Sequence, residues 1–252
     1  MKSKKLLPYI IAIAIFIFAS LTYFYPVLKG QKIAQSDITQ FRGMVKEINN
    51  FRADKNTEPY WTGASFSGMP AYQISAYYPN DFVRSIDRTL RFLPRPADYT
   101  FLYFLSFFVL MLALKIEWRL AILGALSFGF STYLIIIFGA GHNAKAHAIA
   151  YMPLVLAGVL WVFQKRYILG FLVTGFGLAL EIYTNHPQMT YYLGFCLLIL
   201  GVVEFINAIK EKLLPVFIKQ SVVIIAAVLL GIGANSSRLM AMKEYGDYST
   251  RG

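Results

Sequence analysis

The polar residues best suited to chemistry lie in two short segments between long apolar stretches. All three histidines of the chain fall there, two in 139–147 and one in 184–188. The candidate binding residues of the two segments are His142, Asn143, Lys145, His147, Asn185, His186 and Gln188. Imidazole, amide and ammonium groups can together hydrogen-bond a polar or anionic ligand. Two interpretations stay open, a polar cavity formed by both segments or ordinary loop residues that face water.

A metal site is one chemistry that these histidines could support. His142, His147 and His186 are enough ligands for zinc if they converge. No HExxH or CxxC sequence supports such a site, and the charge of Lys145 would oppose a cation. We therefore expect no metal cofactor, and a divalent ion stays unsupported.

Asp37 is the most suggestive carboxylate, because it follows the first apolar stretch by about nine residues and opens an expected helix. A carboxylate held near a membrane can act as general base and deprotonate an acceptor hydroxyl. An aspartate at the start of a helix can equally cap free backbone N–H groups. Basic residues such as Lys145, Arg42 and Arg84 could pair with a phosphate group. The sequence leaves these alternatives open.

Composition identifies the surroundings of these residues. Of 252 residues, 57% are hydrophobic and only 15% are charged, whereas soluble domains carry about 25% charged residues. The net charge of +11 does not point to nucleic acid, because no compact basic domain carries it. The single cysteine, Cys196, excludes an internal disulfide. The chain is predicted to be an all-α polytopic membrane protein.

About seven transmembrane helices are expected, since each apolar block approaches the ~20 residues that span a bilayer. The blocks are 6–28, 99–114, 120–138, 147–163, 168–183, 189–206 and 217–234. Lys2, Lys4 and Lys5 favour a cytoplasmic N-terminus. The short basic connections around 115–119, 164–166 and 210–219 then also fall inside, as the positive-inside rule requires. This topology places all three histidines and Asp37 on the non-cytoplasmic side.

The segment 29–97 differs from the rest, because it is polar, aromatic and interrupted by prolines. Apolar residues recur at helical spacing in 38–51 and in 81–92, which predicts two amphipathic helices. The sequence 66–70 predicts a tight turn in which Gly68 supplies conformational freedom. We therefore divide the chain into a first transmembrane helix, 1–28, a large, partly helical extracytoplasmic loop, 29–97, and a membrane domain of about six further helices, 98–252.

The order of several sequences resembles the YfhO-like bacterial membrane proteins, which are grouped with the GT-C type of glycosyltransferase. The resemblance covers essentially the whole chain. It is carried by Gln-Ser-Asp-Ile-Thr-Gln-Phe-Arg-Gly-Met (35–44), Glu-Pro-Tyr-Trp-Thr (58–62), Gly-Met-Pro-Ala-Tyr-Gln (68–73), Gly-His-Asn-Ala-Lys-Ala-His-Ala (141–148) and Asn-His-Pro-Gln-Met-Thr-Tyr-Tyr (185–192).

This resemblance implies an enzyme of the bacterial plasma membrane that transfers a sugar from a polyprenyl-phosphate carrier to an acceptor on the outer side. Asp37 matches the acidic residue of the first outer loop that is central to catalysis in GT-C proteins. The segments with His142 and His186 would border the carrier phosphate or the sugar. Family members are longer, so the chain is expected to correspond to their N-terminal part.

Two other classes of function fit the same sequence. A transporter or flippase of a lipid-linked or anionic solute would use the outer cavity as its binding site. It would also need polar residues deep in the inner half of the helices, where the sequence has few. A non-catalytic membrane subunit would bind a polyprenyl-phosphate sugar without turning it over.

Overall fold

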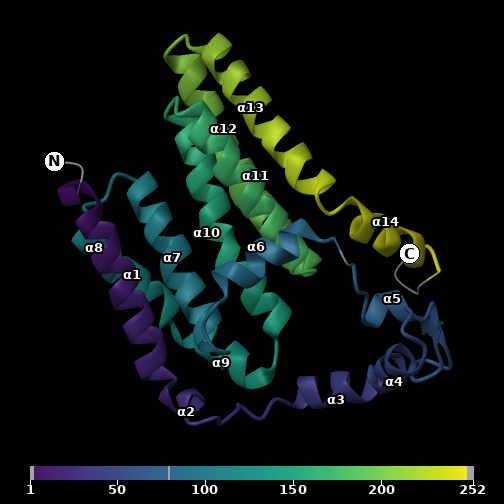
Figure 1. The fold of residues 1–252 in the computed structure, drawn as a ribbon. Helices are drawn as coiled ribbons and strands as arrows, with labels where there is room; N and C mark the ends of the chain where they lie inside the picture. Colours follow the sequence, from purple (N-terminus) through teal and green to yellow (C-terminus); the bar gives the residue numbers. More distant parts are fainter. Residues whose placement is uncertain (1–2, 79, 249–252) are drawn as a thin grey trace.

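The computed structural model describes residues 3–78 and 80–248, and helices dominate it (Figure 1). Within these residues, five segments are long and apolar enough to cross a membrane: Leu6–Tyr23, Trp118–Ala140, Asn143–Phe163, Pro187–Lys210 and Leu214–Gly233. Two further apolar helices, Ala97–Ala113 and Tyr167–Tyr183, have 17 residues each. At ~1.5 Å per residue they are slightly short of a ~30 Å bilayer core. A helical polytopic membrane protein is supported, and seven spans stay a prediction.

The bundle consists of helices that are apolar on most sides, as burial in lipid and protein requires. Its helices are α1 Ser3–Tyr23, α7 Ala97–Ala113, α8 Trp118–Gly129, α9 Thr132–Ala140, α10 Asn143–Phe163, α11 Tyr167–Tyr183, α12 Pro187–Lys210 and α13 Leu214–Gly233. The other elements are α2 Tyr25–Leu28, α3 Ser36–Met44, α4 Lys46–Lys55, β1 Trp61–Thr62, β2 Met69–Pro70, α5 Ala71–Ile74, α6 Phe82–Leu90 and α14 Ser236–Gly246.

Helix α10 lies at the centre, between α7 and α11, and α11 in turn packs against α13. Small residues allow these helices to approach closely, as in other membrane bundles. A Cβ atom at Gly158 of α10 would lie only 2.5 Å from the backbone nitrogen of Thr174 in α11. Gly170 faces Val162 with similar closeness. The contact between α10 and α11 therefore depends on glycine.

Three expected helices are each divided in two. The block 120–138 becomes α8 and α9, separated at Phe130 and Ser131, where Ser131 is extended. Gly129 and Ser131 are weaker helix formers than the residues around them, and a side chain at Gly129 would overlap the ring of Phe104. The segment 38–51 becomes α3 and α4, which meet at Val45, two residues after Gly43. The block 6–28 likewise becomes α1 and α2.

The segment between α4 and α5 is a small antiparallel hairpin. Strands β1 and β2 pair with Trp61 opposite Pro70 and Thr62 opposite Met69. The predicted tight turn is confirmed, since Phe66, Ser67 and Gly68 all have positive φ. Helix α4 holds this hairpin through Glu47, which accepts hydrogen bonds from Thr62 Oγ1 and from the backbone N–H groups of Gly63 and Ala64. The Thr62 hydrogen bond is the main reason that the pKa of Glu47 lies below its ordinary value.

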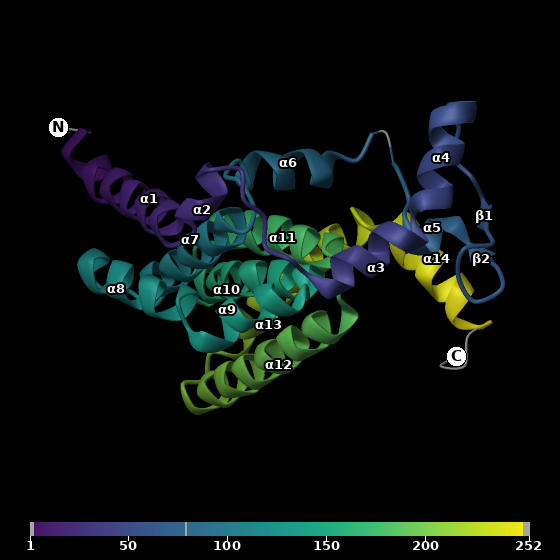
Figure 2. The same ribbon diagram turned by 90° about the horizontal axis from the view of Figure 1, so that it is seen from below.

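The predicted helix in 81–92 is also present, as α6. Asp81 is its N-cap and accepts a hydrogen bond from the backbone N–H of Arg84 at 2.9 Å. Val83 and Asp87 face the bundle and are buried, whereas Phe82 is exposed. Viewed from below, α6 lies along one side of the bundle, near α11, while α3, α4 and the hairpin extend from one end of it (Figure 2).

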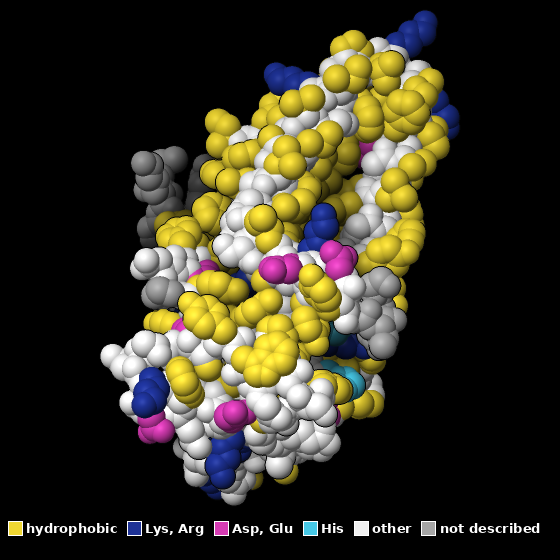
Figure 3. All heavy atoms as spheres, turned by 90° about the vertical axis from the view of Figure 1, so that its right-hand side faces the viewer, with side chains coloured by type: hydrophobic (Ala, Val, Ile, Leu, Met, Phe, Trp, Pro, Cys, Tyr) yellow, Lys and Arg dark blue, Asp and Glu magenta, His cyan; other side chains and the backbone are white. Residues whose placement is uncertain are grey.

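The connections sort to two ends of the bundle. The turns α9–α10, α11–α12 and α13–α14 and the segment 29–35 lie at one end, here called the loop end (Figure 1). The turns α7–α8, α10–α11 and α12–α13, with Lys115, Arg119, Lys165, Arg166 and Lys210, lie at the other. Figure 3 shows a wide apolar surface over the bundle, with Lys and Arg side chains at its upper end and a mainly polar lower part.

Candidate functional site

Asp37 lies beside His142 at the loop end. Helix α3 begins at Ser36 with Gln35 as its N-cap, so Asp37 occupies the first turn and does not cap the helix. Its Oδ2 atom is 3.5 Å from Nε2 of His142, and both side chains are about half exposed, at 49% and 52%. The capping interpretation of Asp37 is therefore wrong, and the carboxylate is available to a ligand.

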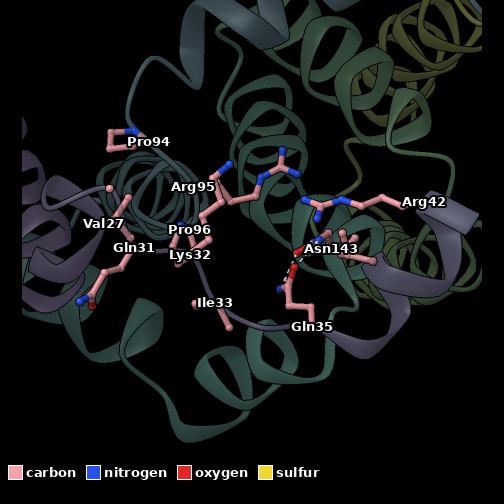
Figure 4. A pocket seen from close by; sticks show the side chains of 12 residues that line it. Val27, Gln31, Lys32, Ile33, Gln35, Arg42, Pro94, Arg95, Pro96 and Asn143 are labelled. Atoms are coloured by element: carbon pink, nitrogen blue, oxygen red, sulfur yellow. Dashed lines mark hydrogen bonds between the residues drawn. The ribbon is translucent and has the colours of Figure 1, made fainter. Parts of the chain in front are cut away.

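Two amides fix the start of α3 on the turn between α9 and α10. The Gln35 side chain donates to the carbonyl oxygen of Phe138 and to Oδ1 of Asn143. Asn143 donates back to Oε1 of Gln35 at 3.2 Å, as the dashed lines in Figure 4 show. This reciprocal pair joins residues 108 positions apart. It places Asp37 against the first segment of candidate residues.

Gly141 permits this close approach. Its φ of +87° is in the left-handed region, and a Cβ atom there would lie 3.1 Å from Cβ of Asp37 and 3.3 Å from Cβ of Gln35. Any other residue would be strained in its backbone and would also displace the start of α3.

We expect Gly141→Ala to destabilise the protein by about 1–2 kcal/mol, the cost of a left-handed conformation for a residue with a Cβ atom. Thermal unfolding in detergent measures the change. Gly139→Ala is the matched control, because Gly139 lies two residues earlier, in α9, and an added Cβ atom there would have no neighbour within 4 Å. Equal unfolding temperatures for the two variants would contradict this explanation of Gly141.

A pocket of about 400 Å³ opens beside this contact. It lies between the segment that follows α2, helix α3, the residues before α7 and the start of α10. Its polar lining residues include Lys32, Gln35, Arg42, Arg95 and Asn143 (Figure 4). In the part of the chain that the structure describes, this lining holds three cations and no carboxylate. The pocket is therefore suited to an anion.

The arrangement of the cations strengthens this conclusion. Figure 4 shows the guanidinium groups of Arg42 and Arg95 directed toward one another, next to the Gln35–Asn143 pair. Like charges that converge repel each other, and a bound anion removes that repulsion. The paired N–H groups of an arginine guanidinium match the spacing of two phosphate or carboxylate oxygens. Arg95 is held in place by stacking on the ring of Tyr99, 4.6 Å from its centroid.

His147, expected to border a substrate, has a different partner. Its Nε2 atom pairs with Oδ1 of Asp87 in α6, and the side chain is only 7% exposed. The hydroxyl of Tyr151 donates to the same oxygen at 2.8 Å. Arg91 donates to Oδ2 at 2.6 Å and, through its other nitrogen, to Asp98 at 3.1 Å. His147 thus belongs to a buried network that fixes α6 on the bundle.

Asp87 is ionised in this network. Burial by itself would raise the pKa of this carboxyl, but the hydrogen bonds from His147 and Arg91 outweigh it and leave the pKa below its ordinary value. The same carboxylate raises the pKa of Arg91. Asp87 was missed in the sequence, although a signal exists. It follows Val83 by four residues and precedes Leu90 by three, and so occupies the apolar face of an amphipathic helix.

The remaining candidate residues do not line the pocket with the three cations, which is called the basic pocket from here on. Lys145 lies over the ring of Tyr133, 5.2 Å from its centroid. Gln188 is exposed and donates to the hydroxyl of Tyr192 on its own helix. Asn185 and His186 line a second, apolar groove. Burial, together with the nearby charges of Lys145 and His142, lowers the pKa of His186.

A three-histidine metal site is not formed, because His147 is paired with Asp87 inside the bundle. Within residues 3–78 and 80–248, no three His, Cys, Asp or Glu side chains gather in a way that could hold a metal ion. Glu181 is buried in α11, and both its oxygens accept from Thr190 Oγ1 of α12, at 3.0 and 3.1 Å.

Comparisons with protein-family models, with curated proteins and with solved structures give no match to this chain. The functional interpretation therefore rests on the geometry of the site.

Proposed function

We propose that this membrane protein is a GT-C-type glycosyltransferase module that transfers a sugar from a polyprenyl-phosphate carrier to an acceptor. The observation that carries the proposal is an accessible carboxylate, Asp37, that lies in the chain between Gln35 and Ile38, two residues that line a pocket with three cations. A glycosyl phosphate donor needs both features. Cations bind the phosphate and stabilise it as it leaves, and a carboxylate activates the incoming hydroxyl.

The residues have separate roles in this proposal. Lys32, Arg42 and Arg95 hold the carrier phosphate, while its isoprenoid chain extends along the apolar surface of the bundle. Asp37 accepts the proton of the acceptor hydroxyl as its oxygen attacks the anomeric carbon. The bond from that carbon to the phosphate oxygen breaks, and the carrier phosphate departs with its electrons. Direct displacement inverts the anomeric centre. His142 orients the Asp37 carboxylate.

The site faces the extracytoplasmic side in this proposal, with the N-terminus in the cytoplasm and segment 29–97 outside. The basic turns at the opposite end favour this orientation. Single cysteines at Asp54 and Glu211, introduced with Cys196→Ser, test it in intact cells. We expect a membrane-impermeant maleimide to label position 54 and not position 211. Labelling of position 211 alone would reverse the orientation and exclude an extracytoplasmic reaction.

The role of the basic pocket is tested by binding of a short polyprenyl phosphate to the purified protein. Lys32→Gln with Arg42→Gln should weaken binding about a hundredfold, since each hydrogen bond to a charged group contributes ~1.5 kcal/mol. Lys46→Gln with Lys55→Gln makes the same change in net charge on α4, outside the pocket, and should leave affinity almost unchanged. Equal losses in the two variants would assign the effect to long-range charge instead of the pocket.

The rival function, transport of a lipid-linked or anionic solute, has one observation in its favour. Glu181 is a buried ionisable group within α11, paired only with Thr190 among the described residues, and such groups often mark ion or solute pathways. Proteoliposomes separate the two functions. Formation of a glycosylated acceptor supports the transferase, whereas movement of intact donor between leaflets without product supports the transporter.

A further inference from the structure

A second cavity system lies away from the basic pocket, where α11, α12, α13 and α14 meet. Its larger part is a groove of about 450 Å³ lined by residues such as Leu178, Leu193, Gly194, Val228 and Leu239. This volume is within the ~300–1,000 Å³ range of small-molecule sites. Most of its lining is apolar. The groove therefore suits a hydrocarbon chain.

A smaller and polar pocket of about 230 Å³ adjoins this groove, because Asn185 and Met242 line both. Its other lining residues include Tyr72, Ser75, Tyr78 and Arg238. Helix α5 is fixed over α14 by a hydrogen bond from Gln73 Nε2 to the carbonyl oxygen of Ala241, at 2.9 Å. The side view in Figure 3 shows apolar side chains around a hollow in the upper part of this face and polar ones below.

The charge in the polar pocket is already balanced. Arg238 pairs with Asp81 Oδ2, donates to the carbonyl oxygen of Tyr183 at 3.3 Å, and stacks near the rings of Tyr78 and Tyr183. The charge of Arg238 is therefore balanced within the protein, whereas in the basic pocket, among the described residues, only Arg95 has a carboxylate partner, Asp98 at 3.8 Å. The chemistry left for a ligand comes from hydroxyl and amide groups, which bind an uncharged polar group.

Two polar groups at the junction of the cavities have no partner in the part of the chain that the structure describes. The Nδ1 atom of His186 is buried without a hydrogen bond. Asn185 has a left-handed backbone, φ +58°, and its exposed side-chain amide makes no hydrogen bond among the described residues. Of the two groups, only the Nδ1 atom of His186 is both buried and without a partner there, which is costly. Both groups line the groove where a head group would enter it.

From this geometry we infer a binding site for an uncharged amphiphile that carries a hydroxylated head group. The hydrocarbon chain lies in the groove between α11, α12 and α13. The head group lies in the polar pocket under α5 and α14, where it hydrogen-bonds Asn185 and His186 and contacts the tyrosine rings. This site goes beyond the proposed transferase and does not depend on it, because it uses none of the cations that would hold a donor phosphate.

The test uses an alkyl glucoside with a diazirine in its chain, added to the whole protein in a detergent without sugar head groups. After irradiation, mass spectrometry should locate the label on α12, α13 and α14. Gly194→Trp should reduce this labelling at least about tenfold by filling the groove. Gly201→Trp is the matched control, because both glycines lie in α12 with nothing within 4 Å and Gly201 is outside the groove. It should leave labelling unchanged.

Two further comparisons test the head group. Asn185→Gly keeps the left-handed backbone, removes the amide, and should weaken glucoside labelling about tenfold, the effect of one lost hydrogen bond of ~1.4 kcal/mol. An alkyl phosphate of equal chain length should label this groove less than the glucoside does. Equal labelling by both probes would overturn the uncharged head group. Equal labelling in the two tryptophan variants, or label spread evenly over the bundle, would overturn the site itself.

Discussion

Asp37→Asn is expected to lower the rate of sugar transfer about 10²–10⁴-fold, the range for loss of a general base. The amide keeps the size of the side chain but cannot accept the proton of the acceptor hydroxyl at neutral pH. Binding of the donor should be almost unchanged, because its phosphate is assigned to Lys32, Arg42 and Arg95 and not to Asp37.

The same substitution should leave the fold intact. Asp37 is half exposed and its pair with His142 spans 3.5 Å, and such surface pairs contribute ~0–1 kcal/mol. The measurement is transfer from a polyprenyl-phosphate sugar by membranes that contain equal amounts of each variant. Asp54→Asn, an exposed carboxylate in the neighbouring helix α4, is the control. Transfer by Asp37→Asn at the rate of the control would remove Asp37 from the mechanism.

Asp87→Asn should destabilise the protein by about 3–5 kcal/mol, the cost of leaving one partner of a buried ion pair uncompensated. The Asp87 side chain is fully buried and accepts from His147, Tyr151 and Arg91. An asparagine cannot accept all these hydrogen bonds, and it leaves the charge of Arg91 only partly balanced by Asp98. Chemical denaturation in detergent measures the loss.

Local release of α6 should accompany this loss of stability. Trypsin should cleave after the exposed Arg88 faster in Asp87→Asn than in wild type, whereas Asp54→Asn should match wild type. Because the pKa of Asp87 is lowered, its ionised form stabilises wild type above the ordinary value of 3.8, and this contribution is lost only as pH falls further. Unchanged denaturation and unchanged cleavage in Asp87→Asn would mean that α6 is held by apolar packing alone.

The elements were largely predictable, whereas their interruptions were not. Hydropathy over some 20 residues identified the apolar helices, and helical spacing identified α6 within 81–92. The breaks at Val45 and at Phe130–Ser131 were missed. A break of this kind depends on contacts such as that between Gly129 and Phe104, which are remote in sequence. Propensity is a weak guide where tertiary packing competes with it.

The candidate site was likewise predictable only in part. The two polar segments and Asp37 stand out by residue type, and the structure brings Asp37 to His142 and its neighbour Gln35 to Asn143. It does not bring His147 to them, because that ring is the nearest partner of a buried aspartate 60 residues away. Arg95, which completes the basic pocket, gives no signal in the sequence, since a surface arginine and a convergent one are identical there.

The sequence by itself therefore determined that lipid surrounds much of the protein and that its elements are helices, because both follow from local composition. A helix satisfies its own backbone groups wherever lipid surrounds it, and no distant residue is needed. Tertiary structure alone decided which polar groups meet, as in the Gln35–Asn143 pair, 108 residues apart, and the Asp87 network. Such meetings depend on helix packing and on the places where helices break, and both are properties of the whole folded chain.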